Sequence, residues 1–136
     1  MSKWLQAKLS TLSNIETEFF SEALLRMGYK ADFGRKKLMR PEGDYQEVDC
    51  VVVDERSGKD IGVGLRFHAE KDGDVSMTVV ADWFYSHLTS EGFTEKFTIE
   101  YNTVKYIAAA ENMNFSVESI ENLADGRRRI VVARAA

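Results

Sequence analysis

Polar side chains that could do chemistry gather in the middle of the sequence, on stretches in which apolar and polar residues alternate. Such alternation is typical of half-buried strands, whose successive side chains point to opposite faces. Glu47, Asp49, Arg66 and His68 fall on the polar side of the alternation, and Asp82 follows further along. A histidine beside carboxylates and an arginine can serve as acid or base toward a small anionic or polar ligand. The pattern is that of a ligand site on the outer face of a sheet.

Two glycines, Gly62 and Gly64, lie inside one of these stretches and would leave a shallow gap in the same face. Glycine within a strand often marks the close approach of a ligand or of another backbone. The candidate ligand-binding set is therefore Glu47, Asp49, Gly62, Gly64, Arg66, His68 and Asp82. The alternative is an ordinary solvated face, on which Asp49 and Arg66 form an exposed ion pair worth at most about 1 kcal/mol. Solvated faces are the commoner case.

The turns between these stretches fix which residues face each other. We expect a two-residue loop at Ser57 and Gly58 and a three-residue loop at residues 71–73. Both send the same side chains to the inside of the sheet. The inward pairs are Val48 with Phe67, Cys50 with Leu65, Val52 with Val63, Leu65 with Val79, and Phe67 with Met77. The outward pairs are Asp49 with Arg66, Glu47 with His68, and His68 with Ser76.

An aromatic run, Trp83, Phe84 and Tyr85, follows the last of these stretches. Tryptophan and tyrosine are frequent anchors of protein interfaces, so the run is a candidate partner-binding patch. The alternative is that it packs a helix onto the sheet. A nearby histidine and two carboxylates match no standard spacing of metal ligands, and we predict no metal site.

Two basic clusters stand apart from these residues, one at residues 35–37 with Arg40 and one at residues 127–129. If the fold brought them together, they could contact a phosphate backbone. The chain carries a formal net charge of −4 at pH 7, which argues against binding nucleic acid through bulk electrostatics. Nucleic-acid binding is therefore an alternative rather than the leading hypothesis.

The single cysteine, Cys50, is expected in the core, where a free thiol behaves as a small apolar residue. One cysteine cannot form an internal disulfide, and with two histidines it is too few for a typical structural zinc site. The sequence holds no phosphate loop, dinucleotide fingerprint or serine-nucleophile motif. We therefore expect no cofactor, and the sequence leans away from an enzyme.

Two long helices are predicted from apolar residues at helical spacing. The first helix starts at a capping box whose first residue is Ser13, and this helix ends at Gly28. The second runs from Phe93 to about residue 112, with Glu100 on its outer side.

The remaining elements are strands. Residues 30–43 form either an irregular strand or a loop, because they hold the only proline and a basic cluster. Strands are predicted at 5–9, 47–54, 61–68 and 75–82, with a C-terminal hairpin of 115–120 and 128–133. Helices before and after a run of antiparallel strands predict an α+β fold, an antiparallel sheet made of a meander plus the hairpin, with both helices on one face.

Length and composition set the scale. The 136 residues have the length of one domain, and 44% hydrophobic with 29% charged residues is a globular balance. Residues 1–136 are therefore expected to form a single domain. The first residues lack the apolar core of a signal peptide, and no run approaches the roughly 18 apolar residues of a membrane span. We expect the cytoplasm, or the plastid stroma if a plastid encodes the chain, and no membrane partner.

Short motifs along nearly the whole chain resemble a known family. They are Ser2-Lys3-Trp4, Met27-Gly28-Tyr29, Asp60-Ile61-Gly62-Val63, Val80-Ala81-Asp82-Trp83, Tyr101 with Val104, Asn114-Phe115, Asp125-Gly126 and Arg129-Ile130-Val131-Val132. Their order and spacing resemble the hypothetical chloroplast reading frame thirty-five proteins of plastids, cyanobacteria, other bacteria and phages. Asn114 departs from that pattern, which usually has glycine there. The resemblance implies a fold and a compartment but no reaction, because the family has no agreed catalytic residues. Some bacterial relatives look like companions of AAA-type ATPases, which suggests an accessory role.

The sequence is compatible with three functions. The leading hypothesis is an accessory or adaptor domain that binds a protein partner, or a second copy of itself, through the outer face of the sheet or the aromatic run. The second is a small-molecule sensor or enzyme that uses the outer-face set. The third is nucleic-acid binding through the two basic clusters.

Overall fold

The computed structural model describes residues 5–9, 16–39, 43–71, 73, 75–81 and 90–134. The helices in these ranges are α1 (Thr17–Arg26) and α2 (Ser90–Asn112). The strands are β1 (Leu5–Leu9), β2 (Tyr29–Asp32), β3 (Lys37–Met39), β4 (Tyr45–Glu47), β5 (Cys50–Asp54), β6 (Asp60–Ala69), β7 (Val75–Ala81), β8 (Phe115–Asn122) and β9 (Arg128–Arg134). The segment that the sequence left open between strand and loop therefore contains β3 and most of β2.

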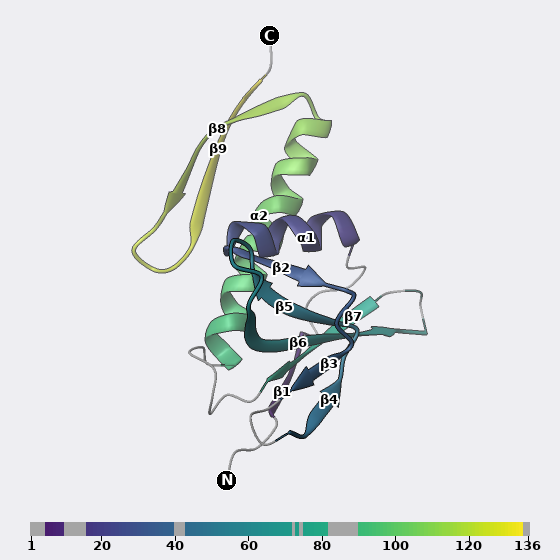
Figure 1. Ribbon diagram of the computed structural model, residues 1–136. Coiled ribbons are helices and arrows are strands. Elements are labelled where there is room, and N and C mark those ends of the chain that lie inside the picture. The colour runs from purple at the N-terminus through teal and green to yellow at the C-terminus, as the bar shows by residue number, and fades with distance from the viewer. Residues whose placement is uncertain are drawn as a thin grey trace.

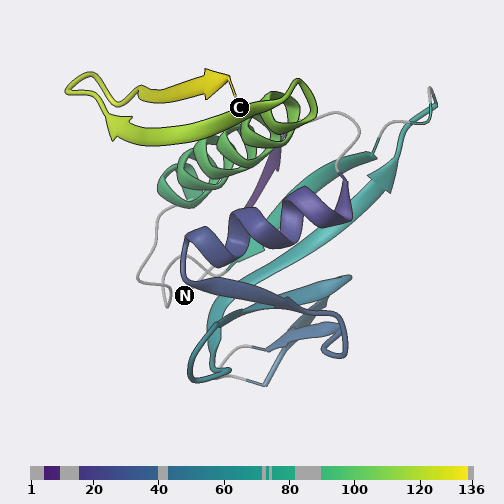
Figure 2. The same cartoon turned by 90° about the horizontal axis from the view of Figure 1, so that it is seen from above.

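Five strands form the main sheet in the order β1-β7-β6-β5-β2, and each neighbouring pair is antiparallel. The predicted meander β5-β6-β7 is its centre. Both helices pack on one face of this sheet (Figures 1 and 2). The predicted α+β fold, with an antiparallel sheet and both helices on one face, is confirmed.

The main core lies between the helices and this sheet. Helix α1 supplies Phe20 and Leu24, and α2 supplies Phe93 and Phe97, all fully buried. The rings of Phe20 and Phe97 meet with their centroids 5.9 Å apart. The strand residues of this core are Cys50, Val52, Val63, Leu65, Met77, Val79 and Ala81. Burial of this apolar surface is the main force that holds the helices on the sheet.

The β3-β4 hairpin covers part of the outer face of the sheet, which we expected to be solvated. Leu38 of β3 and Val48, just after β4, form a second buried cluster with Val51, Val53 and Val80. The sheet is therefore buried on both faces at its centre. This explains why the strand that contains Val51 and Val53 is a continuous apolar run.

The registers predicted from the turns hold across the meander. The confirmed pairs are Cys50–Leu65, Val52–Val63, Leu65–Val79, Phe67–Met77 and His68–Ser76. The first turn differs from the expected two-residue loop, because the Asp54 N–H donates to the Lys59 carbonyl oxygen at 2.8 Å. A bulge at Gly62, with φ of +83°, then restores the predicted register from Val63 onward.

Val48 is the exception, and its predicted inward position opposite Phe67 is wrong. Strand β5 begins only at Cys50, and the Val48 N–H donates to the Lys36 carbonyl oxygen at 2.9 Å instead of joining the ladder with β6. Val48 therefore packs with Leu38 on the outer face. A corner in the chain between β4 and β5 has replaced the longer strand expected over residues 47–54.

Both helices end where the sequence predicted. Gly28 and Asn114 have φ of +87° and +67°, the left-handed conformation that terminates helices. The start of α1 differs, because its N-cap is Glu16, whose side chain makes no capping bond. The Glu16 N–H instead donates to the Tyr101 hydroxyl of α2 at 3.3 Å. Ser13, the start of the predicted capping box, lies outside the described residues.

The predicted C-terminal hairpin is present as β8 and β9, but it forms a two-stranded sheet of its own. It packs on α2, mainly through β8, and Figure 2 shows α2 between this hairpin and the main sheet. None of the helices in the described ranges is long and apolar enough to cross a membrane.

Candidate functional site

Four of the predicted ligand-binding residues come together at the corner between β4 and β5. Glu47, Asp49, Arg66 and His68 line a pocket of about 420 Å³ on the outer face. The other lining residues are Lys36, Lys37, Val48 and Phe67. The pocket therefore contains both acidic and basic side chains, as the strand alternation suggested.

Three charged groups of this corner are bonded to the main chain. Asp49 Oδ2 accepts the Phe67 N–H at 2.7 Å. Arg66 Nε donates to the Glu47 carbonyl oxygen at 2.7 Å, and Lys36 Nζ donates to the Asp49 carbonyl oxygen at 3.1 Å. The expected pairing of Asp49 with Arg66 is thus replaced by bonds that fasten β4 and the start of β5 to β6.

The two glycines do not form a floor for this pocket. Gly62 lies in the bulge near the other end of β6, where its N–H donates to Asp60 Oδ1 at 2.6 Å. At Gly64, an added Cβ would lie 2.6 Å from Val48 Cγ1. The Val48 side chain therefore fills the space above Gly64, and the close approach that this glycine permits is one of internal packing.

The remaining predicted residues are placed only in part. His68 is exposed, and its Nε2 lies 3.0 Å from Thr78 Oγ1 on the neighbouring strand. Asp82 and the aromatic run Trp83, Phe84 and Tyr85 lie outside the described residues.

The described residues of the two basic clusters are not brought together, and Arg40 lies outside the described residues. Residues 35–37 adjoin β3 on the outer face of the main sheet, whereas residues 127–129 belong to the β8-β9 hairpin on the helix side. Several of their charges are also paired locally. These pairs are Arg35 with Asp32 at 3.1 Å, Arg127 with Asp125 at 2.6 Å, and Arg129 with Glu121 at 2.8 Å. Within the described residues, the fold offers no joint basic patch for a phosphate backbone.

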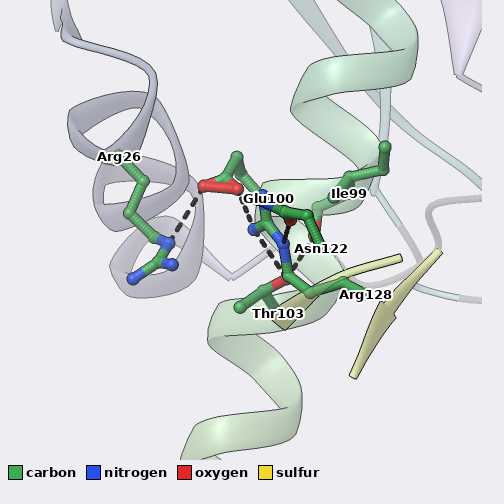
Figure 3. A network of polar contacts seen from close by, with 6 residues as sticks. All are labelled: Arg26, Ile99, Glu100, Thr103, Asn122 and Arg128. Atoms are coloured by element: carbon green, nitrogen blue, oxygen red, sulfur yellow. Dashed lines mark hydrogen bonds and ion pairs between the residues drawn. The ribbon is translucent and has the colours of Figure 1, made fainter. Parts of the chain in front are cut away.

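A charged junction on the helix side was missed by the sequence analysis. Glu100, expected on the outer side of α2, is only 8% exposed. Figure 3 shows its carboxylate between two arginines from different elements. Arg26 of α1 places Nε 2.9 Å from Glu100 Oε2, and Arg128 of β9 donates to Glu100 Oε1. One carboxylate thereby joins α1, α2 and the hairpin.

Arg128 is held by two further contacts. Its terminal nitrogen lies 3.3 Å from Thr103 Oγ1, and its Nε donates to Asn122 Oδ1 at 3.0 Å. A carboxylate removed from water is tolerated when it is paired and hydrogen-bonded, and the two arginines meet that condition for Glu100. We call Arg26, Glu100 and Arg128 the Glu100 junction.

A sequence signal for this junction exists, although it is weak. Glu100 follows Phe93 by seven residues and Phe97 by three, so it lies on the apolar side of α2. A charged residue within an apolar helical stripe indicates a buried partner of opposite charge.

Two cavities flank the Glu100 junction. The first, of about 610 Å³, lies beside the end of α1 and is bordered by Arg26, Lys96 and Arg128. The second is a groove of about 940 Å³ between α2 and the turn of the hairpin, where Tyr106 is 62% exposed. Arg128 borders both cavities, so the junction separates them.

The hairpin has two outer edges that no other described strand covers. Such edges present a row of unpaired N–H and C=O groups, which is a template for pairing with another chain. Its aliphatic side chains, among them Ile120, Ile130 and Val131, are only half-buried. This region therefore combines open backbone groups with apolar surface.

Cys50 is fully buried, as predicted, and burial raises the pKa of its thiol to about 12. A thiol with so high a pKa is not a nucleophile at neutral pH. Among the described residues, no group of histidine, cysteine and carboxylate side chains is arranged to hold a metal ion.

Comparisons with known proteins place the chain in a family. No curated protein and no solved structure matches it significantly. The family described as "Protein of unknown function (DUF1257)" matches residues 23–131, a range that contains the main core except Phe20, together with the β4-β5 corner and the Glu100 junction. Since this match covers most of the chain, the protein belongs to the DUF1257 family.

Proposed function

We propose that this protein is an accessory domain that binds a protein partner, and that the partner adds an extended segment to the open edge of β9. The supporting observation is that the β8-β9 hairpin is a sheet separate from the main one. The hairpin packs on α2 mainly through β8, and β9 lies on the side away from α2 (Figure 2). Strand addition at an open edge gives affinity through main-chain hydrogen bonds.

The side chains of β9 support the same proposal. Arg128 points toward α2, where it reaches Glu100, so Arg129, Val131 and Ala133 lie on the opposite face. Val131 and Ala133 are only half-buried in the protein alone. A partner strand paired with β9 would place its own side chains beside this apolar face and shield part of it from water.

Two finer assignments belong to this proposal. One is membership of the hypothetical chloroplast reading frame thirty-five family, with the cytoplasm or stroma as compartment. The other is an AAA-type ATPase as the partner, which the resemblance suggests. A second copy of this chain is a further partner of the same chemistry, because an open edge can pair with its own copy.

The experiment starts from the affinity-tagged full chain, used to capture partners that are then identified, purified and titrated. Val131→Lys places a charge on β9, and lysine on an edge strand opposes strand addition. Ser119→Lys is the matched control, because Ser119 is the cross-strand neighbour of Val131 on β8. We expect Val131→Lys to weaken binding at least about tenfold and Ser119→Lys to leave it nearly unchanged.

Two results would count against the proposal. One is a partner that binds both variants as tightly as the wild type. The other is a strict monomer by light scattering from which no partner is recovered. Loss of binding in Ser119→Lys alone would move the interface to β8.

A small-molecule sensor or enzyme at the β4-β5 corner is a second candidate. It is favoured by the convergence of Glu47, Asp49, Arg66 and His68 on one pocket. Among the described residues, His68 bonds only to Thr78, so His68→Ala should remove ligand-induced thermal stabilisation with little change in the melting temperature of the free protein. An unchanged response of this variant to a panel of small carboxylates and phosphates would exclude His68 from ligand binding.

A further inference from the structure

We propose that the cavity beside the end of α1 is a binding site for a small anion, specifically a phosphate monoester with an apolar body. The cavity measures about 610 Å³ and lies between the end of α1, the start of β2 and the first half of α2. Pockets of roughly 300–1,000 Å³ with apolar walls and a few placed polar groups are typical of small-molecule sites. Nothing in the family description assigns a ligand to it.

The charge around this cavity favours an anion. Among the described residues, three cations border it, Arg26, Lys96 and Arg128, against the single carboxylate of Glu100. Three positive charges and one negative charge leave an excess of two positive charges, although the whole chain carries −4. A local positive field in an acidic protein attracts anionic ligands to one place.

Donors remain available at this cavity. Arg26 uses its Nε for Glu100, and Figure 3 shows its two terminal nitrogens turned away from that carboxylate. The Arg26 side chain is 35% exposed. Lys96 is exposed and makes no ion pair within the described residues. The planar guanidinium fork matches phosphate oxygens, and a lysine adds a mobile point charge.

The junction holds Arg26 and Arg128 in place before a ligand arrives. Glu100 orients Arg26, while Arg128 is held by Glu100, Thr103 and Asn122. Side chains that are already ordered lose less conformational entropy on binding. Since Glu100 is neutralised by two arginines, its own repulsion of an anion is reduced.

The apolar wall indicates an ester rather than a free phosphate ion. Met27, Tyr29 and Ile99 border the cavity and are half-buried. The Tyr29 ring is stacked on the buried Phe93 ring, with centroids 6.4 Å apart and planes at 22°. This packing holds Tyr29 in place as a flat wall against which an apolar body can lie.

The test is an NMR titration of the full chain in about 0.15 M salt with two probes, inorganic phosphate and phenyl phosphate. We expect saturable amide shifts in residues 26–29 and 96–100 with both probes. Phenyl phosphate should bind roughly tenfold more tightly, because its ring buries apolar surface. Equal affinities would overturn the ester and leave a plain anion site, and the absence of saturable shifts in these residues would overturn the proposal altogether.

A substitution at Lys96 tests whether a cation that borders the cavity contributes to ligand binding. Lys96→Gln should weaken phenyl phosphate binding about tenfold without changing the melting temperature, since Lys96 makes no ion pair among the described residues. Lys105→Gln is the matched control, an exposed lysine on the same helix that does not border the cavity. Affinities that are equal in Lys96→Gln and Lys105→Gln would contradict the site.

Discussion

Two polar regions lie on opposite sides of the main sheet, and they use their charges differently. At the β4-β5 corner, Asp49 and Arg66 bond mainly to backbone groups of neighbouring strands, although Arg66 also donates to Gln46 Oε1 at 3.0 Å. At the Glu100 junction, side chains bond to side chains from three separate elements. The first arrangement shapes the chain locally, whereas the second holds a separate hairpin onto the body of the protein.

A polar face identified from strand alternation is therefore not always free to bind a ligand. The corner residues were found from the sequence, but much of their hydrogen-bonding capacity is used within the fold. The junction was not found from the sequence, yet it leaves cationic donors beside a cavity.

The largest effect is expected at the junction. Glu100→Gln leaves Arg26 and Arg128 partly buried without a counter-charge, and breaking such a pair costs several kcal/mol. Because Arg26 is partly solvated, we expect a loss of about 3 kcal/mol in the free energy of unfolding, measured by urea denaturation. The exposed Glu95→Gln on the same helix should change it by less than about 0.5 kcal/mol. Equal effects of the two variants on the free energy of unfolding would show that the Glu100 junction does not stabilise the fold.

A smaller effect is expected at Gly64. Gly64→Ala brings a Cβ within 2.6 Å of Val48 Cγ1, and overpacking of this kind costs about 2 kcal/mol. Adding Val48→Ala should recover part of the loss, because it removes the nearest methyl group. A Gly64→Ala variant as stable as the wild type would show that the space above this glycine is open after all.

The smallest effect is expected at the corner itself. Asp49→Ala removes the acceptor of one exposed N–H, that of Phe67, and should cost about 1 kcal/mol in denaturant unfolding. Ser116→Ala on β8, whose hydroxyl makes a long 3.4 Å contact, is the control and should cost less. A loss of unfolding free energy in Asp49→Ala as large as that in Glu100→Gln would show that the two regions contribute equally to stability.

The meander β5-β6-β7 could be predicted from the sequence because alternation is a local signal, although its first turn is longer than the expected two-residue loop and the bulge at Gly62 restores the register. The positions of β1 and β2 at the edges of the sheet were not predicted. The pairing of Cys50 with Leu65 and of Leu65 with Val79 follows from residues close in the chain. Val48 could not be placed, since its position depends on the backbone of Lys36 and on the β3-β4 hairpin. Tertiary contacts of this kind override local alternation.

The Glu100 junction was less predictable than the fold. Glu100 is separated by 74 residues from Arg26 and by 28 from Arg128 in the sequence. Only the packing of α1, α2 and the hairpin brings these three side chains together. Their types and spacing carry no motif, so the junction emerges from the tertiary structure.

Hydrogen exchange in the native protein tests whether the β8-β9 hairpin is a separate unit that the Glu100 junction holds onto α2. We predict that amides of β8 and β9 exchange through an opening that requires less free energy than global unfolding, and that amides of β6 exchange only by global unfolding. Glu100→Gln should speed exchange in the hairpin further. Hairpin amides that are protected as strongly as those of β6, in both the wild type and Glu100→Gln, would show that the hairpin opens only when the whole protein unfolds.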